Sequence, residues 1–274
     1  MKKKMVWLAA MLVVTCAAGV GAAEAPLQIA KVVRSYPHDP HASTQGLVFF
    51  GDHLLESTGG YGRSTLRRVD PATGQLLLSR DLPPELFGEG LAVHGGVLYQ
   101  LTWLSGTVLR YDPETLSPLE SLQIGREAWG LASDGERLVM SDGSAVLRFV
   151  DPANFDEIGR IVVRDGAGEV PGLNELEFVQ GLLFANVYPT SEVVMIDPAT
   201  GAVVGRLDLS ALAPQMEDAL HTRVANGIAY DPATGRLLVT GKLWPAIFQV
   251  EVPKDVWSSV PPGKISSGHR EFTR

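Results

Sequence analysis

Short runs of apolar and alternating residues, separated by turn residues, follow one another along almost the whole chain. Segments such as 96–101 and 236–240 are rich in Leu and β-branched residues and are bounded by turn residues such as Gly. This pattern is typical of short antiparallel strands. Helical periodicity is nearly absent, and only residues 210–220 are expected to form a short helix or an ordered insertion. The pattern predicts an all-β protein.

An Asp-Pro turn recurs five times, with aspartates at positions 70, 112, 151, 197 and 231. Pro presets φ for a turn, the Asp side chain can bond the backbone two residues on, and the Gly that ends three copies supplies positive φ. Each copy follows one apolar run and precedes another, so each is predicted to be a hairpin turn.

A second signature, typically a residue followed by Gly and then Leu, runs out of phase with the turns. Its central positions are 46, 90, 130, 175 and 227. Five units of about 40–45 residues match the length of a four-stranded propeller blade. We therefore predict a five-bladed β-propeller. A six-bladed closure is the alternative, if the termini build a further blade that the sequence does not reveal.

The residue before each central position is expected to lead into the innermost strand of a blade and to face the mouth of the central channel. This ring comprises Gln45, Glu89, Trp129, Asn174 or its neighbour Glu175, and Asn226. Purely structural positions there would be expected to carry Val, Ala or Ser. A polar and aromatic ring instead indicates a ligand site.

The first residues have the pattern of a secretory signal peptide. Lysines at 2–4 precede an apolar run over 5–14 and then a stretch of small residues. We predict a signal peptide over 1–23 and one propeller domain over 24–274, located in the periplasm or secreted. A retained N-terminal anchor and lipidation of Cys16 are the alternatives. Cys16 is the only cysteine, so the mature domain would contain no disulfide.

The charge of the chain restricts its partners. The formal net charge is −8, and loss of the signal peptide with its lysines makes the protein more acidic still. An acidic protein of this kind is not expected to bind nucleic acid or an anionic membrane surface. We expect no membrane association after signal cleavage, and a monomer.

Nine stretches, in order between about 36 and 250, form a recognisable set: 44–47, 56–64, 88–91, 99–103, 129–131, 140–144, 173–177, 185–187 and 239–245. With this ordered set the chain resembles the plant and bacterial type of glutaminyl-peptide cyclotransferase. The resemblance implies a five-bladed propeller that converts the N-terminal glutamine of peptides to pyroglutamate and releases ammonia. It also implies chemistry that needs no metal or other cofactor.

By motif position, the resemblance implies a pocket built from Gln45, Glu89, Trp103, Trp129, Asn174 and Lys242. Two positions depart from the family pattern. Ser43 stands where Phe is usual, and Tyr188 stands where Trp is usual. Tyr188 is therefore expected to contact substrate with a smaller aromatic surface, which affects pocket shape more than chemistry.

The reaction needs a group that takes a proton from the α-amine and returns it to the leaving nitrogen. Glu89 is the candidate, unless it caps a loop or pairs with an arginine. Lys242 is expected to donate a hydrogen bond to the developing oxyanion, unless it is a solvated strand end. Gln45 and Asn174 would orient the substrate, and the two tryptophans would form pocket walls. Glu175 is a second acid candidate.

His38, Asp39 and His41 lie close together but lack the spacing of a zinc site, and no cysteine ligand accompanies them. A structural loop is the favoured interpretation, while a calcium ion in the channel stays open. Two rival functions also remain. One is a metal-dependent propeller lactonase that uses Glu89, Asn174, Asn226 and Asp231. The other is a non-catalytic periplasmic binding propeller.

Overall fold

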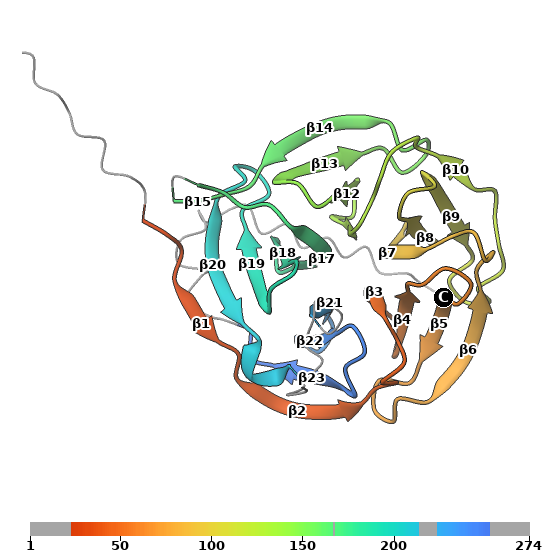
Figure 1. Cartoon of the computed structure of the whole chain (residues 1–274), viewed down its shortest axis with the longest axis horizontal. Helices are drawn as coiled ribbons and strands as arrows, with labels where there is room; N and C mark the ends of the chain where they lie inside the picture. Colours follow the sequence, from red (N-terminus) through yellow and green to blue (C-terminus); the bar gives the residue numbers. More distant parts are fainter. Residues whose placement is uncertain (1–22, 167, 214–223, 253–274) are drawn as a thin grey trace, which may run out of the picture.

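The computed structural model describes residues 23–166, 168–213 and 224–252. Five blades, each with antiparallel blade strands, surround a common axis (Figure 1), which confirms the five-bladed propeller and not the six-bladed alternative. Over the predicted insertion, a 3₁₀ helix covers Ser210–Leu212, and 214–223 lie outside the described residues. No helix in the described ranges is long and apolar enough to cross a membrane. The predicted signal peptide, except for residue 23, also lies outside them and stays a prediction.

Each blade has its innermost strand near the axis and its outermost strand at the rim. Blade 1 consists of β3 (Thr44–Phe50), β4 (His53–Thr58), β5 (Thr65–Val69) and β6 (Leu76–Asp81). Blade 2 consists of β7 (Gly88–His94), β8 (Val97–Thr102), β9 (Thr107–Tyr111) and β10 (Leu122–Gln123). Blade 3 consists of β11 (Leu131–Ser133), β12 (Leu138–Met140), β13 (Val146–Val150) and β14 (Glu157–Val162).

Blade 4 consists of β17 (Leu173–Val179), β18 (Leu182–Val187), β19 (Glu192–Ile196) and β20 (Val203–Asp208). A short ribbon of β15 (Arg164–Asp165) and β16 (Gly168–Glu169) precedes it. Blade 5 consists of β21 (Ala225–Asp231), β22 (Arg236–Gly241) and β23 (Ala246–Val250). Its outer strand is β2 (Val32–Pro37), which comes from the other end of the chain.

The N-terminal segment closes the ring. Strand β2 pairs antiparallel with β23, and β1 (Leu27–Ile29) pairs parallel with β20 at the rim of blade 4 (Figure 1). This closure corrects one feature of the predicted repeat. Four Asp-Pro turns join a third strand to an outer strand, whereas Asp231 joins β21 to β22. In blade 5 the described residues end at 252, shortly after the third strand, and β2 supplies the outer strand.

All five turns use the predicted chemistry. The Asp70 carboxylate, for example, accepts hydrogen bonds from the backbone N–H groups of Ala72 at 2.8 Å and Thr73 at 3.0 Å. The residue four places after each aspartate has positive φ. In two copies that residue is Leu116 or Phe155 instead of Gly. Both side chains are buried, so apolar burial offsets the backbone strain.

The apolar core lies between the blades. Each of the five buried clusters joins two neighbouring blades; one of them, for example, contains both Phe184 of blade 4 and Trp244 of blade 5. Burial at these contacts drives the blades together. The region near the axis is left to polar groups, and there the candidate site is built.

Candidate active site

One end of the propeller carries the predicted site residues. Gln45, Glu89, Asn174 and Asn226 each occupy the second position of an innermost strand, and Trp129 lies just before β11. The second strand of every blade runs antiparallel to the first. The loops between second and third strands therefore come to the same end. These loops carry Tyr61, Trp103, Tyr188 and Lys242.

The repeated glycines let the blades approach one another at this end. A Cβ atom at Gly46 would lie 2.5 Å from the backbone nitrogen of Leu91, and one at Gly90 would lie 2.5 Å from that of Leu131. Neither distance leaves room for a side chain. Backbone-to-backbone contact between successive blades thus requires glycine and places the preceding residues in one ring.

Glu175 occupies the glycine position of blade 4 and ties three blades together. Its Oε1 accepts a hydrogen bond from the N–H of Leu47 at 3.2 Å, and its Oε2 accepts one from the N–H of Ile228 at 2.8 Å. Burial, with the nearby charge of Glu177, raises the pKa of Glu175 well above its ordinary value. Both oxygens are engaged by backbone groups. These contacts indicate that Glu175 holds three blades together, and not that it acts as the second acid considered from the sequence.

Glu89 is buried, with 5% of its surface exposed. Burial raises its pKa, the positive charge of Lys242 opposes that rise, and the negative charge of Glu127 adds to it, which brings the value to about 8. Glu89 takes part in none of the ion pairs formed by the described residues, so the alternative of an arginine partner does not hold there. A carboxyl group with this pKa can both accept and donate a proton near neutral pH.

Lys242 faces the same space from the loop between β22 and β23. Burial lowers the pKa of its ammonium group, and the charge of Glu89 offsets part of that effect. Its Nζ lies 5.3 Å from the centre of the Tyr188 ring, a cation–π contact. Tyr188 in turn meets Trp129 edge-on, with ring centres 5.8 Å apart. Tyr188 therefore contacts both Trp129, in the aromatic wall, and the ammonium group of Lys242.

Sequence reasoning missed Glu127, which fixes both tryptophans. Its Oε1 accepts a hydrogen bond from Trp103 Nε1 at 2.6 Å and another from Trp129 Nε1 at 2.8 Å. The two indoles belong to different blades, so one carboxylate sets their relative position. Glu127 has an exposed surface and stands in the connection between blades 2 and 3. No local pattern separates it from an ordinary surface glutamate.

Phe87 is a second aromatic residue that the sequence reasoning did not single out. Its ring meets Trp103 at 5.5 Å and Tyr61 at 5.4 Å between centres. It also lies against Gly59, close to the side chain of Gln45. Phe87 therefore supplies aromatic surface beside Gln45.

Side-chain oxygen atoms that accept hydrogen bonds lie among the site residues near the axis of the propeller. Asn226 donates from Nδ2 to Gln45 Oε1 at 3.1 Å and to the carbonyl of Thr44 at 2.9 Å. The Oδ1 atoms of Asn174 and Asn226 are buried and lack a hydrogen-bond partner among the described residues. Buried acceptors of this kind are normally satisfied by protein, water or ligand. Asn174 and Asn226 can thus accept a hydrogen bond from a bound amine or amide.

The histidine motif near the N-terminus anchors the lysine loop. His38 is buried; its Nδ1 lies 2.7 Å from the carbonyl oxygen of Trp244 and its Nε2 lies 2.9 Å from Glu56 Oε1. The backbone adds hydrogen bonds from His38 N–H to the Pro245 carbonyl and from Leu243 N–H to the Ala42 carbonyl. Both ring nitrogens of His38 are thereby engaged, and the structure assigns it to holding the loop that carries Lys242.

The residues considered for a zinc site or for a lactonase metal site do not form a common site. Asp39 forms an ion pair with Arg67 at 2.8 Å. Asp231, required by the lactonase alternative, lies at the far end of β21 from Asn226 and pairs with Arg236 at 3.0 Å. Within the described ranges, no group of three His, Cys, Asp or Glu side chains is arranged to hold a metal ion.

Comparisons with known proteins agree with this geometry. A family profile described as glutamine cyclotransferase matches residues 5–252. The chain is 40% identical over 226 residues to a glutaminyl-peptide cyclotransferase of Arabidopsis thaliana, an alignment covering 81% of this chain and 71% of that protein. The crystal structure of Myxococcus xanthus glutaminyl cyclase superposes with a TM-score of 0.78 at 38% identity, covering 83% of this chain and 98% of the other. The chain belongs to the glutamine cyclotransferase family.

Proposed function

We propose that this protein is a glutaminyl-peptide cyclotransferase that converts the N-terminal glutamine of peptides or proteins to pyroglutamate. Its family and its 40% identical relative support the activity. The observation that carries the mechanism is the buried Glu89 carboxyl group, with a pKa of about 8, beside Lys242. The proposed location is the periplasm or the outside of the cell, and the proposed state is a monomer.

In this mechanism the α-amine nitrogen attacks the side-chain amide carbon of the same glutamine. The new C–N bond closes the five-membered ring, and the bond to the amide nitrogen breaks. Glu89 accepts a proton from the attacking amine and returns it to the leaving nitrogen, which departs as ammonia. Glu89 ends in its starting protonation state, so the protein needs no further reactant.

The pKa of Glu89 suits this transfer. An α-amino group ordinarily has a pKa of about 7.7–8.0. Proton exchange between that amine and Glu89, at about 8, is therefore nearly balanced in energy. Attack requires a neutral amine and an ionised Glu89, so the reactive complex holds no proton on either group. The pH profile of kcat/KM should therefore rise as Glu89 and the free amine lose their protons, and level off above about pH 8.

The remaining residues position and stabilise the reactants. The indoles of Trp103 and Trp129 would enclose the glutamine side chain, which favours an intramolecular attack geometry. Lys242 would donate a hydrogen bond to the oxygen that becomes negative during attack. Gln45 and Asn174 supply amide groups that can hold the substrate amine and carboxamide.

The decisive experiment measures ammonia release from a glutamine-initiated dipeptide amide by the purified protein, with and without EDTA. We expect release that persists in EDTA and falls at least about a hundredfold in Glu89→Gln, the scale of general acid–base catalysis. Glu136→Gln, an exposed residue in the turn between β11 and β12, is the matched control and should retain full activity.

Two results would contradict the proposal. Release abolished by EDTA would indicate a metal-dependent reaction. Absence of release from every glutamine-initiated peptide would contradict the activity itself and leave a binding propeller.

A further inference from the structure

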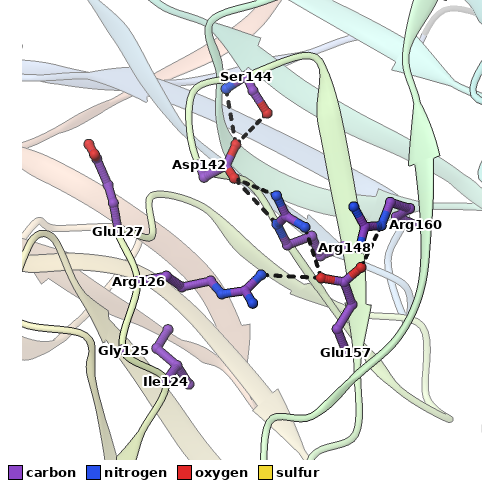
Figure 2. A pocket seen from close by; sticks show the side chains of 9 residues that line it. All are labelled: Ile124, Gly125, Arg126, Glu127, Asp142, Ser144, Arg148, Glu157 and Arg160. Atoms are coloured by element: carbon purple, nitrogen blue, oxygen red, sulfur yellow. Dashed lines mark hydrogen bonds and ion pairs between the residues drawn. The ribbon is translucent and has the colours of Figure 1, made fainter.

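An open depression lies on the flank of blade 3, next to the proposed site. Its volume is about 580 Å³, in the range of small-ligand sites. Residues that line it include Glu127, Arg126, Arg148, Arg160, Asp142 and Glu157 (Figure 2). Glu127 is also the residue that holds Trp103 and Trp129, so the depression begins where the indole walls end.

Three guanidinium groups and three carboxylates line the depression. Glu157 is shared by three guanidinium groups, at 3.2 Å from Arg126, 2.8 Å from Arg148 and 2.6 Å from Arg160. In the part of the chain that the structure describes, only Arg148 has a second carboxylate partner, Asp142 at 3.3 Å. Three cations thus share two anions, while Glu127 stands apart from this cluster and accepts from the indoles (Figure 2). Counted with Glu127, the lining has three arginines and three carboxylates, so an anion would be bound by exposed guanidinium donors and not by a net positive charge.

Arg126 and Arg160 retain donors for a ligand. Their side chains are 44% and 62% exposed, and among the described residues each forms one ion pair, with Glu157. A guanidinium group has five N–H donors in a planar fork that suits a carboxylate. Arg148 is more enclosed and is occupied by its two partners, so it serves to hold Glu157 and Asp142 in place.

The depression adjoins the proposed site at Glu127, which holds both indoles. If the N-terminal glutamine lies between the indoles, the rest of the peptide must leave the site across its rim. Arg126 is adjacent in the chain to Glu127, and an extended peptide advances about 3.3 Å per residue. A carboxylate three or four residues into the substrate can therefore reach Arg126 and Arg160.

We propose that this depression is a subsite for the substrate segment that follows the N-terminal glutamine, and that Arg126 and Arg160 bind a carboxylate of that segment. The inference rests on the proposed function and adds a preference among its substrates. The carboxylate can come from an acidic side chain or from the C-terminus of a short peptide.

The test compares kcat/KM for matched substrates. One pair consists of pentapeptide amides beginning Gln-Ala, with Glu or Gln at the fourth position. A second pair is Gln-Ala-Ala as the free acid and as the amide. We expect the wild-type protein to favour the charged member of at least one pair by about five-fold, the scale of an exposed ion pair. The pair that responds identifies the source of the carboxylate.

The double variant Arg126→Gln/Arg160→Gln should lose this preference while its kcat/KM for the dipeptide amide Gln-Ala stays unchanged, because that substrate does not reach the arginines. Arg34→Gln, on the exposed outer strand β2, is the matched control and should keep the preference. Equal kcat/KM within both pairs for the wild type would overturn the proposal. A preference that persists in the double variant would also overturn it.

Calorimetric titration separates this inference from the proposed function. Glu89→Gln is first introduced into both the wild type and the double variant, so that neither turns over substrate. The same peptides are then titrated into each protein to measure Kd. Tighter binding of the acidic peptide that depends on the two arginines supports the subsite even if ammonia release fails. Equal Kd values for acidic and neutral peptides contradict the subsite even if release is observed.

Discussion

Glu127 and Trp129 lie two residues apart, and the carboxylate of the first accepts a hydrogen bond from the indole of the second at 2.8 Å. The same oxygen accepts the indole N–H of Trp103, on the neighbouring blade, at 2.6 Å. The two indoles that wall the site are therefore oriented by Glu127, which itself lies at the rim of the site. The negative charge of Glu127 also helps to raise the pKa of Glu89.

Two substitutions at position 127 should separate these effects. Glu127→Ala removes the acceptor, frees both indoles and is expected to lower kcat/KM about tenfold or more, with KM affected most. Glu127→Gln keeps an oxygen acceptor but removes the charge, so the pKa of Glu89 should fall and the rising limb of the kcat/KM profile should move to lower pH. An unchanged pH profile in Glu127→Gln would contradict this coupling.

Glu89 should lower stability at alkaline pH. Its folded-state pKa is raised from 4.5 to about 8. The folded state thus binds the proton more tightly than the unfolded state, and the stability this provides at low pH is lost as pH rises from 4.5 through about 8. Glu89→Gln removes this penalty. We expect it to raise the free energy of unfolding by about 2 kcal/mol or more at pH 9.

Urea denaturation at pH 5 and pH 9 checks this expectation. The gain should be large at pH 9 and small at pH 5, where Glu89 is protonated in the folded protein. An equal effect at both pH values would show that Glu89 is not a buried acid of raised pKa.

Glu175 should be needed for folding. Glu175→Leu leaves the N–H groups of Leu47 and Ile228 without their acceptor, and we expect a loss of about 2–4 kcal/mol in unfolding free energy. Glu175→Gln retains one carbonyl acceptor and should lose less than half as much. Thermal unfolding of both variants provides the measurement, and similar losses for Leu and Gln would argue against the hydrogen bonds as the cause.

The buried pair of His38 and Glu56 should affect both stability and activity. Burial works to lower the pKa of His38, but the charge and hydrogen bond of Glu56 outweigh it and the pKa is raised. Burial works to raise the pKa of Glu56, and His38, Thr44 and Arg67 together lower it. The stability due to His38 is therefore present below pH 6.5 and is lost as pH rises through its raised pKa.

Glu56→Gln should reduce the unfolding free energy at pH 6 by about 3 kcal/mol, because it leaves His38 buried without its counter-charge. It should also raise KM, since His38 holds the loop that carries Lys242 through the Trp244 carbonyl. Glu251→Gln, which breaks an exposed pair with Lys31, is the control and should leave the midpoint of urea unfolding unchanged. A similar midpoint for both variants would contradict the anchoring role.

The sequence revealed the propeller because each blade repeats its local chemistry. Asp70 and its four counterparts form the same side-chain-to-backbone turn wherever they occur, independent of the neighbouring blade. The glycines of the second signature likewise occur where the innermost strands of neighbouring blades approach closely, as Gly46 does beside Leu91. Even so, the repeat did not show that Asp231 occupies a different turn, because β2 completes blade 5 from the start of the chain.

The sequence also placed Gln45, Glu89, Trp129 and Asn174 in one ring, because residues at the same position of equivalent strands lie together at one end of a propeller. Contacts between distant parts of the chain were decided only by the tertiary structure. Glu175 reaches Leu47 and Ile228, His38 reaches Trp244, and Glu127 joins Trp103 to Trp129. The pKa of Glu89 depends in the same way on burial and on charges brought in from other blades. Turn and strand preferences act over a few residues and can be read along the chain, whereas desolvation and hydrogen bonding between blades exist only once the ring has closed.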